Sequence, residues 1–413
     1  MAESVSSLSA TATHAAARSG FMAAIFLMAT SAIGPGFITQ TATFTAKLGA
    51  AFAFAILASI VIDFVVQLNI WRITALTGRN ASDTANAAIP GSGYLLAVLV
   101  LIGGLAFNIG NIAGAGLGVN AMLGLDPKLG GVISALLAIG IFLSKRAGLL
   151  LDRSLIGLGL LMIGMTLVVA LVSQPPVGEA LRQTILPEIV DFATITTIVG
   201  GTVGGYITYS GAHRLLDKGL TGEHNLAAVT RASLSGIAVT GLMRAVLFLA
   251  ILGVVASGVT LELSSQAANP AAQAFAAVLG DWGMRIFGVV LWAAAITSVI
   301  GAAYTSVSFL TVFSPMDDRA RNIATVAFIA LSLAVYISLG TAPAAILVFV
   351  GGFNGLILPI GLTIFTYVGF ARSDLMGGHV YNRPLLIAAA VVCALTWYMG
   401  FKSIGPIFAF LGK

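Results

Sequence analysis

A proline between two glycines, Gly34-Pro35-Gly36, interrupts the first long apolar segment of this chain. Pro35 has no N–H and clashes with the preceding turn of a helix, and the two glycines have no side chain to favour helical geometry. A break in a spanning helix frees backbone N–H and C=O groups that hydrocarbon cannot satisfy, so such a break must be buried in protein or line a cavity. The segment therefore predicts a helix broken near the middle of a membrane.

A second glycine-rich interruption, Val199–Tyr206, follows about 170 residues later and reads Val-Gly-Gly-Thr-Val-Gly-Gly-Tyr. Paired interruptions at corresponding places in two halves of a membrane protein are the best sequence indication of a transport site. We therefore expect these two stretches to face one another.

Composition places the chain in a lipid bilayer. Hydrophobic residues make up 58% of it and charged residues 8%, whereas soluble domains are about 25% charged. The net charge of +5 is dispersed over short loops, so it does not indicate nucleic-acid binding. The single cysteine, Cys393, excludes a disulfide within the chain and a cysteine-based metal site, and we expect it to be a packing residue.

The apolar segments predict about eleven transmembrane helices in an all-α, polytopic membrane protein. Residues 1–19 have no apolar core, so we expect a flexible cytoplasmic tail and no cleavable signal peptide. Residues 20–413 are expected to form one transmembrane transporter domain. The predicted helices cover about 20–46, 50–75, 93–122, 129–144, 150–173, 189–216, 228–257, 283–313, 322–339, 343–369 and 384–400.

Loop charge predicts the orientation. Most Lys and Arg residues fall in alternate loops, which the positive-inside rule assigns to the cytoplasm. We therefore expect a bacterial inner (cytoplasmic) membrane protein with its N-terminus in the cytoplasm and its C-terminus outside. The segments then assigned to the outer side contain only Lys47, Lys128, Arg182, Lys402 and Lys413.

Two halves of five helices enter the membrane in opposite senses, because five is odd. Repeat one covers about 20–174, repeat two about 189–369, and an extra helix covers about 384–400. A broken helix opens each half. This is the 5+5 inverted-repeat architecture of the leucine-transporter-type fold, with helices 1 and 6 broken.

Several short motifs resemble the natural resistance-associated macrophage protein (Nramp) family of divalent-metal transporters. They are Gly34–Gly36, Leu48-Gly49, Thr77–Asn80 and Gly200–Val203. The chain looks more narrowly like a divergent, Nramp-like bacterial branch whose members are often encoded beside 5-oxoprolinase subunits. The resemblance implies the family's fold and a role in transport.

The family's metal ligands are missing at the matching positions. Its helix-1 motif Asp-Pro-Gly-Asn ligates metal through Asp and Asn, and Gly34 and Phe37 stand there. Its helix-6 Met-Pro-His motif corresponds to Gly204, Gly205 and Tyr206, and its helix-10 Gln falls near Gly351. Divalent cations need oxygen-rich and usually anionic ligand shells. We therefore expect no metal site of the family's type.

The family's proton-moving acidic pair in helix 3 is also missing. It falls on Asn108 and Asn111, whereas a helix-6 basic residue is kept in kind near Lys218. The resemblance thus carries over the fold but not the metal chemistry.

The two breaks are better suited to an anion. Half-helix N-termini carry free N–H groups and partial positive charge, and neither break contains an acidic residue. We expect a small organic carboxylate to bind there. The candidate substrate-binding residues are Gly34, Gly36, Phe37, Thr39, Gln40, Asn108, Asn111, Gly204, Gly205, Tyr206, Tyr209 and Asn354.

Each candidate also has a structural interpretation. The glycines could serve close helix packing, Thr39 and Gln40 could cap the second half-helix, and the tyrosines and asparagines could join helices.

Candidate coupling-ion residues lie in helices 1, 2 and 8. Asp63 could carry a proton, or could pair with Arg244 or a polar neighbour. Carbonyl groups near Ala32 and Ile33 could bind Na⁺ together with helix-8 hydroxyls, although helical Ser and Thr more often bond their own backbone. Those hydroxyls belong to Thr305 and Ser306, or to Thr297 and Ser298, and His213 is expected at the cytoplasmic rim.

The sequence as a whole predicts a secondary-active transporter that works by alternating access, and no enzyme or cofactor. It contains no ATP-binding Gly-x-x-x-x-Gly-Lys-Ser/Thr loop. The favoured substrate is a small carboxylate, with 5-oxoproline suggested by the resemblance alone, moved with H⁺ or Na⁺ by a protein expected to be monomeric. The alternative is a divalent-metal (Mn²⁺ or Mg²⁺) transporter that uses carbonyl and amide ligands. A membrane sensor is disfavoured because no soluble signalling domain is present.

Overall fold

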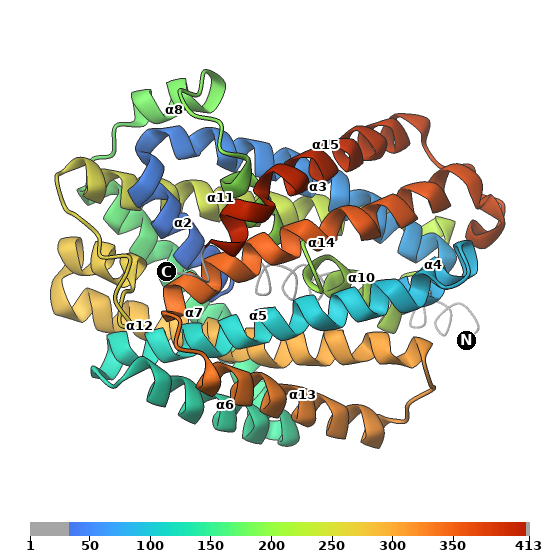
Figure 1. Ribbon diagram of the computed structural model, residues 1–413, viewed down its shortest axis with the longest axis horizontal. Helices are drawn as coiled ribbons and strands as arrows, with labels where there is room; N and C mark the ends of the chain where they lie inside the picture. Colours follow the sequence, from blue (N-terminus) through green and yellow to red (C-terminus); the bar gives the residue numbers. More distant parts are fainter. Residues whose placement is uncertain (1–32, 410–413) are drawn as a thin grey trace, which may run out of the picture.

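The computed structural model describes residues 33–409, without the side chains of 145–156, and every regular element in this part is helical (Figure 1). The α-helices are α2 Pro35–Leu48, α3 Phe52–Thr77, α4 Ala81–Ala88, α5 Ser92–Leu123, α6 Pro127–Leu143, α7 Lys145–Val172, α8 Val177–Ile185, α9 Phe192–Gly200, α10 Ile207–Asp217, α11 Leu226–Ala256, α12 Pro270–Ser308, α13 Asp318–Ser338, α14 Pro343–Ala371 and α15 Arg383–Phe408. Short 3-10 turns follow α2, α10, α12 and α14.

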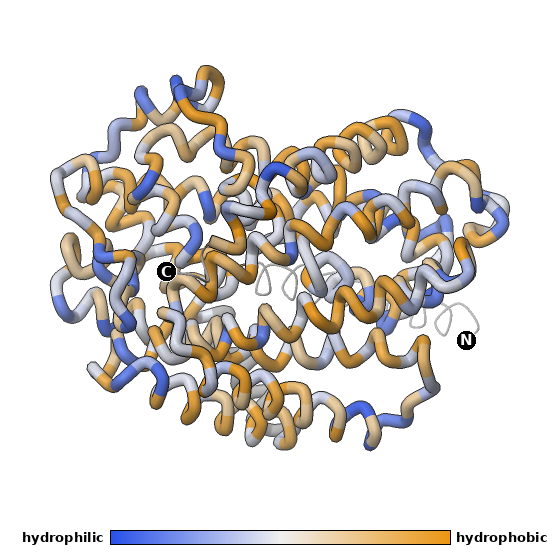
Figure 2. The backbone as a smooth tube through the Cα atoms, viewed as in Figure 1, coloured by the Kyte–Doolittle hydropathy of each residue, from blue (hydrophilic) through white to orange (hydrophobic). Residues whose placement is uncertain are grey.

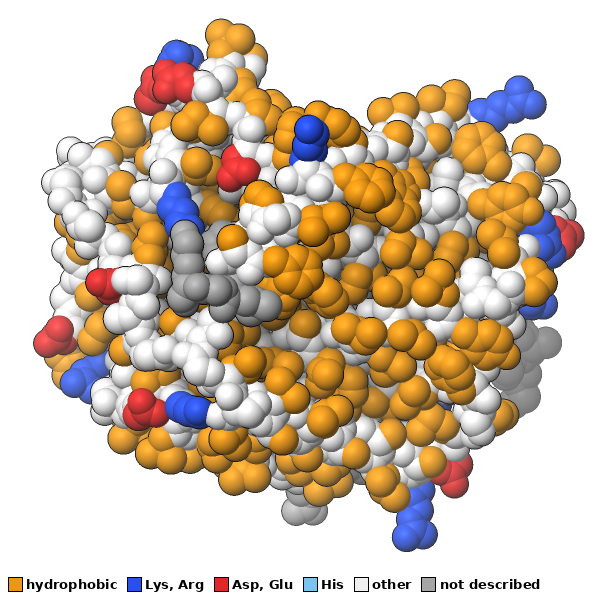
Figure 3. All heavy atoms as spheres, in the orientation of Figure 1, with side chains coloured by type: hydrophobic (Ala, Val, Ile, Leu, Met, Phe, Trp, Pro, Cys, Tyr) orange, Lys and Arg blue, Asp and Glu red, His pale blue; other side chains and the backbone are white. Residues whose placement is uncertain are grey.

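The surface is that of a membrane protein. Hydrophobic residues cover the middle of the long helices, and hydrophilic residues gather toward the two ends of the long axis (Figure 2). The same face in space-filling view shows a broad apolar area between the charged ends (Figure 3). Seven of the described helical segments are long and apolar enough to cross a membrane, or eight if the bent pair Gly157–Val172 and Val177–Ile185 counts as one.

This number is compatible with the eleven predicted spans. Each predicted span has a helix or a helix pair as its counterpart. One of the seven segments, Pro35–Thr77, contains both α2 and α3, and α6 and the separate helices α9 and α10 are each shorter than the other spans. The predicted first half of helix 1 lies outside the described residues.

α5 forms the centre of the helix bundle. It packs most extensively against α12 and also against α6 and α14, and it runs between α14 and α12 in Figure 1. Small residues permit this close approach. A Cβ atom on Gly118 would lie 2.7 Å from the backbone nitrogen of Trp292 in α12, a distance that real Cβ contacts do not reach.

The second predicted break is present, and at the first the described residues Ile33 and Gly34 are non-helical. Gly34 is extended (φ −82°, ψ −177°) and α2 begins directly after it at Pro35. α9 ends at Gly200 and α10 begins at Ile207, with Gly205 in the left-handed region at φ +54°. Glycine tolerates that conformation, whereas a residue with a Cβ is strained there.

Three segments predicted as loops contain helix. The polar stretch after Arg79 forms α4, and the outer loop at 174–188 forms the short α8. α12 begins at Pro270 and not near 283, because Asn269 caps it by accepting from the Ala272 N–H, and it bends at Gly280. Two boundaries also differ, since α7 begins at Lys145 with almost no turn before it and α15 continues to Phe408.

Candidate functional site

The N-terminus of α2 is built by glycine and proline with no side-chain cap. Gly34 is the N-cap residue, and Pro35 occupies the first helical position. α5 comes so close that a Cβ on Gly114 would overlap with the Pro35 ring. Of the predicted site residues here, Gly36 and Phe37 follow in the first turn, Ile33 is half-buried before it, and Ala32 lies outside the described residues.

Gln40 connects α2 to the second break and to α14. It is fully buried, and its Nε2 donates to the carbonyl oxygen of Leu347 at 2.9 Å. A Cβ on Gly201 or on Gly351 would overlap with its carboxamide. Its Oε1 has no hydrogen-bond partner within the described residues. Gln40 therefore does not cap α2, and its carbonyl oxygen lies against the second break. Thr39 is buried beside it on α2.

The second break packs against the backbone of α14. A Cβ on Gly200 would overlap with the backbone of Gly351 and Gly355, and one on Gly204 would lie 3.0 Å from the Asn354 carbonyl oxygen. This close approach explains the glycines in structural terms. A role in ligand binding remains a proposal.

Asn354 joins α14 to α5 and to this break. Its Nδ2 donates to the carbonyl oxygens of Gly103 (3.2 Å) and Val350 (2.9 Å). Its Oδ1 lies where a Cβ on Gly205 would be and has no partner among the described residues. Two unpartnered amide oxygens, on Gln40 and Asn354, thus border the second break.

The two α5 asparagines face different neighbours. Asn108 donates to the hydroxyl of Ser332 on α13 at 3.2 Å, which connects helices as the structural interpretation expects. Asn111 lies within hydrogen-bonding reach of Tyr206, at the end of the second break. The Tyr206 ring meets Phe107 edge-on at 5.3 Å. Only Asn111 of the pair is therefore placed at a break.

Tyr209 belongs to an aromatic cluster. Its ring lies 5.3 Å from Phe309 and 6.1 Å from Phe365. His213, which the sequence predicts at the cytoplasmic rim, packs against Phe309 of the same cluster and is buried. Its Nε2 accepts the backbone N–H of Ala81 at 3.2 Å, and this hydrogen bond explains the burial.

The α12 hydroxyls make contacts of their own. Thr305 donates to Ser210 of α10 at 3.3 Å, and Thr297 bonds its own helix backbone. The hydroxyls of Ser298 and Ser306 have no partner among the described residues. A Na⁺ site between them and helix 1 remains a prediction, because Ala32 is outside the described part.

A buried charged cluster joins both breaks. Asp63 on α3 is 2% exposed, and its Oδ2 accepts from Thr202 of the second break at 2.7 Å. Arg244 on α11 is 1% exposed, and its Cζ lies 4.3 Å from the ring centre of Phe37, just after the first break. Its Nη1 donates to Ser59 of α3 at 3.3 Å. From the sequence, Arg244 is expected only as a partner for Asp63.

These two charges interact without forming a direct ion pair. Each acts on the other electrostatically, yet none of the ion pairs among the described residues joins them. Asp63 Oδ1, Arg244 Nε and Arg244 Nη2 all lack a hydrogen-bond partner there. A lone Arg inside an apolar helix is by default a functional candidate, and this signal could have identified Arg244 from the sequence.

The chemistry of the site is amide, hydroxyl and guanidinium. Within the described residues, no group of three or more His, Cys, Asp or Glu side chains is placed to hold a metal ion. The arrangement can donate hydrogen bonds to an anion from Arg244, and it can offer the amide oxygens of Gln40 and Asn354 to a donor or a cation.

Comparison with solved structures defines the class of fold. The chain superimposes on a crystal structure of the Eremococcus coleocola manganese transporter with a TM-score of 0.70 at 16% identity, over 94% of this chain and 86% of that one. It also superimposes on MhsT in complex with L-phenylalanine, with a TM-score of 0.61 at 16% identity, over 93% and 98% of the two chains. The fold is thus the leucine-transporter-type fold of membrane transporters.

The chain belongs to the natural resistance-associated macrophage protein-like (Nramp) family, whose sequence profile matches residues 25–404. An uncharacterized membrane protein of Haemophilus influenzae is 53% identical over 371 residues, which are 90% of this chain and 91% of that protein. The uncharacterized membrane protein YcsG of Bacillus subtilis is 48% identical over 379 residues, 92% of each chain. The protein is therefore a multi-pass membrane protein of a transporter family.

Proposed function

We propose that this protein is a secondary-active transporter that carries a small organic carboxylate across the bacterial inner membrane by alternating access, together with H⁺ or Na⁺. The observation that carries the proposal is the fully buried Arg244 guanidinium over Phe37, in the first turn of the helix that begins at the first break. A buried cation next to a free helix N-terminus attracts an anion. A guanidinium has donors only, so it offers no ligand to a divalent cation.

The positions that resemble the family's metal ligands support the same conclusion. Gly34, Phe37, Gly204 and Gly205 supply no carboxylate or thioether to either break. Fold alone does not decide between substrates. The named substrate candidate, 5-oxoproline, offers a carboxylate for Arg244 and a lactam for amide partners such as Gln40 and Asn354.

A divalent metal is the second candidate. The unpartnered Oε1 of Gln40 and Oδ1 of Asn354 are oxygen ligands of the kind that Mn²⁺ or Mg²⁺ can use, and they border one break. The structurally similar Eremococcus coleocola protein is a manganese transporter. The two candidates differ in the sign of the charge that the site must accept.

A binding panel distinguishes them. Purified protein is titrated with Mn²⁺, Mg²⁺ and a set of small acids including 5-oxoproline, with and without Na⁺, and its melting temperature is followed. We expect saturable stabilisation by an acid and none by the metals. Stabilisation by Mn²⁺ or Mg²⁺ alone would contradict the proposal.

The variant Gly34→Asp sharpens this test. It puts a carboxylate at the first break, which should abolish stabilisation by the acid and introduce stabilisation by Mn²⁺. Gly140→Ala is the matched control, because Gly140 has nothing within 4 Å of its Cβ position. Unchanged acid binding in Gly34→Asp would place the substrate elsewhere.

A further inference from the structure

The free edge of Arg244 identifies the group that it can bind. A guanidinium presents Nε and Nη2 along one edge, and that edge matches the two oxygens of a carboxylate. Nη1 of Arg244 is used by Ser59, whereas Nε and Nη2 have no partner among the described residues. The two unused donors of Arg244, Nε and Nη2, are thus the pair that can form two parallel hydrogen bonds to one carboxylate.

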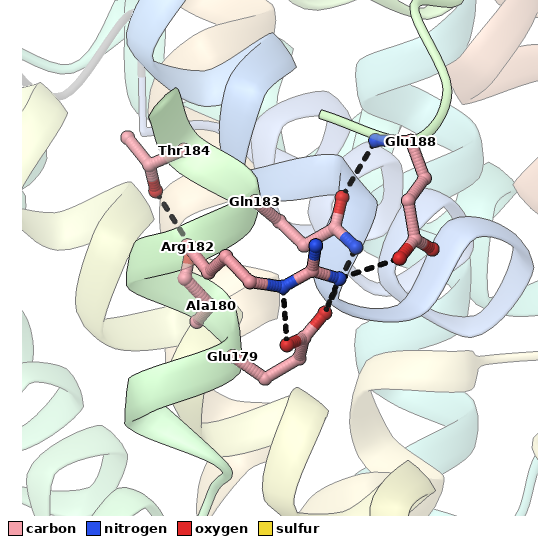
Figure 4. Close-up of polar contacts among 6 residues, drawn as sticks. All are labelled: Glu179, Ala180, Arg182, Gln183, Thr184 and Glu188. Carbon is pink, nitrogen blue, oxygen red and sulfur yellow. Dashed lines mark hydrogen bonds and ion pairs between the residues drawn. The ribbon is translucent and has the colours of Figure 1, made fainter. Parts of the chain in front are cut away.

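Two other arginines of this protein use the same edge for a carboxylate. Nε and Nη2 of Arg182 donate to Oε2 and Oε1 of Glu179 at 2.8 and 2.7 Å (Figure 4). Nε and Nη2 of Arg372 donate to Asp374 at 2.9 and 2.8 Å. In both pairs the carboxylate belongs to the chain. At Arg244 no acidic side chain of the described residues takes that place.

Charge balance then involves Asp63. Within the described side chains, Asp63 and Arg244 are the fully buried acidic and basic residues, and together they are neutral. A substrate carboxylate bound to Arg244 would leave the Asp63 charge uncompensated in a low-dielectric interior, which is strongly unfavourable. The anion can therefore enter at low cost only if a cation neutralises Asp63.

A proton suits Asp63 better than Na⁺. Thr202 occupies Oδ2, while Oδ1 has no partner and can take a proton. Arg244 is the charged group that acts on Asp63, and Thr202 is its polar partner from the second break. The other buried titratable side chains around the second break are Tyr206, Tyr209 and His213, but the hydrogen bond that Asp63 accepts comes from Thr202. Na⁺ needs several oxygen ligands, and Thr202 supplies one.

We propose that Arg244 and Asp63 are the substrate-coupled pair of this protein: the Nε and Nη2 edge of Arg244 binds the substrate carboxylate, and a proton on Asp63 balances its charge. The inference rests on the proposed carboxylate transport. Phe37 and Thr202 place the pair against both breaks, so the pair contacts both of the segments that rearrange in alternating access. One H⁺ and one carboxylate bind from one side and leave on the other, so each cycle moves no net charge.

Calorimetric titration of the wild-type protein with 5-oxoproline tests the proton link. The carboxyl group of the probe stays ionised between pH 5.5 and 8, since the pKa of an α-carboxyl group is about 3.5. Binding that takes up one proton should weaken by up to about tenfold for each unit that the pH rises, with or without Na⁺. Pyrrolidin-2-one, the same ring without the carboxylate, should show no saturable binding.

Two variants test the two residues. Arg244→Lys keeps the charge but loses the two-bond edge, and 5-oxoproline should bind about 10- to 100-fold more weakly. Asp63→Asn mimics the protonated acid, and its affinity should equal that of the wild type at low pH and no longer vary with pH. Arg182→Lys and Asp281→Asn, at exposed positions, are the matched controls and should bind like the wild type.

The outcomes separate this inference from the proposed function. Acid binding that does not depend on pH, depends on Na⁺ instead, or is unchanged in Arg244→Lys overturns the inference and leaves the carboxylate transporter standing. Stabilisation by Mn²⁺ or Mg²⁺ alone overturns both. If either variant fails to fold, the pH dependence of the wild type and the pyrrolidin-2-one comparison still decide.

Discussion

Two arginines of this protein lie in opposite environments. Arg182 on α8 is 47% exposed and is held by two carboxylates, Glu179 and Glu188 (Figure 4). Arg244 on α11 is 1% exposed, lies over Phe37, and has no carboxylate on its Nε and Nη2 edge among the described residues. Water solvates the first ion pair, so that pair contributes little to stability. The second guanidinium is kept in a place where an unpaired charge is costly.

The two environments distinguish a structural arginine from a functional candidate. A surface pair satisfies its own charges and needs no ligand. A buried guanidinium with two unpartnered donors, close to both breaks, can donate them to a bound ligand.

The largest effect should come from removing the buried guanidinium. Arg244→Met leaves Asp63 buried without a compensating charge, and we expect the free energy of unfolding to fall by about 3–5 kcal/mol. Adding Asp63→Leu should recover most of the loss, because both charges are then gone. Denaturant unfolding of the purified variants measures this, and Arg182→Met should not differ from the wild type. A loss that the double variant does not recover would show that Arg244 acts through packing.

The next effect concerns the contact between Asp63 and the second break. Thr202→Val removes the hydroxyl that donates to Asp63, and we expect a loss of about 1–3 kcal/mol in unfolding free energy because a buried carboxylate oxygen is left unsatisfied. The control is Thr297→Val, whose hydroxyl bonds only its own helix backbone. Equal losses in the two variants would mean that the contact with Asp63 contributes nothing.

A smaller effect is expected from the backbone of the same break. Gly205→Ala puts a side chain at φ +54° and against Asn354 Oδ1. The left-handed conformation should cost about 1–2 kcal/mol, and Asn354 must move as well. Gly140→Ala, in α6 with nothing near its Cβ position, should be neutral. Thermal unfolding of the two variants compares them, and an unaffected Gly205→Ala would argue against a rigid break.

The smallest effect should be at the surface. The hydrogen bond from Arg182 lowers the pKa of Glu179 to about 2, so the pair is ionised at neutral pH. The ion pair's contribution to folding stability is fully present when the pH is above 4.5, the ordinary pKa of a glutamate. It is lost as the pH falls through about 2, the pKa of Glu179 in the folded protein. Because the pair is exposed, we expect Glu179→Gln to leave the melting temperature at pH 7 unchanged. A clear decrease in the melting temperature would show that this exposed ion pair on α8 stabilises the fold.

The sequence predicted the breaks because their cause is local. Pro35 and its flanking glycines, and the glycines at 200–205, cannot continue a regular helix wherever they lie. The number of spans and the five-plus-five arrangement followed from apolar length and loop charge. These properties belong to single segments and do not depend on which helices pack together.

The site was predicted only in part because it depends on packing between distant segments. Gln40 contacts Leu347, 307 residues away, and no local pattern shows that partner. Arg244 reaches Phe37 only because α11 packs against α2 and α3. The start of α12 could have been predicted from the sequence, since Asn269-Pro270 combines a capping residue with proline at the first helical position.

The most direct test of the central claim is uptake by the purified protein in proteoliposomes. Labelled 5-oxoproline or ⁵⁴Mn²⁺ is added outside, an inside-alkaline pH gradient is imposed without Na⁺, and the membrane potential is clamped or varied with valinomycin and K⁺. We predict transient accumulation of the acid that follows the pH gradient and ignores the potential, with no accumulation of Mn²⁺. Accumulation of Mn²⁺ without accumulation of the acid would contradict the account and would identify the protein as a divalent-metal transporter.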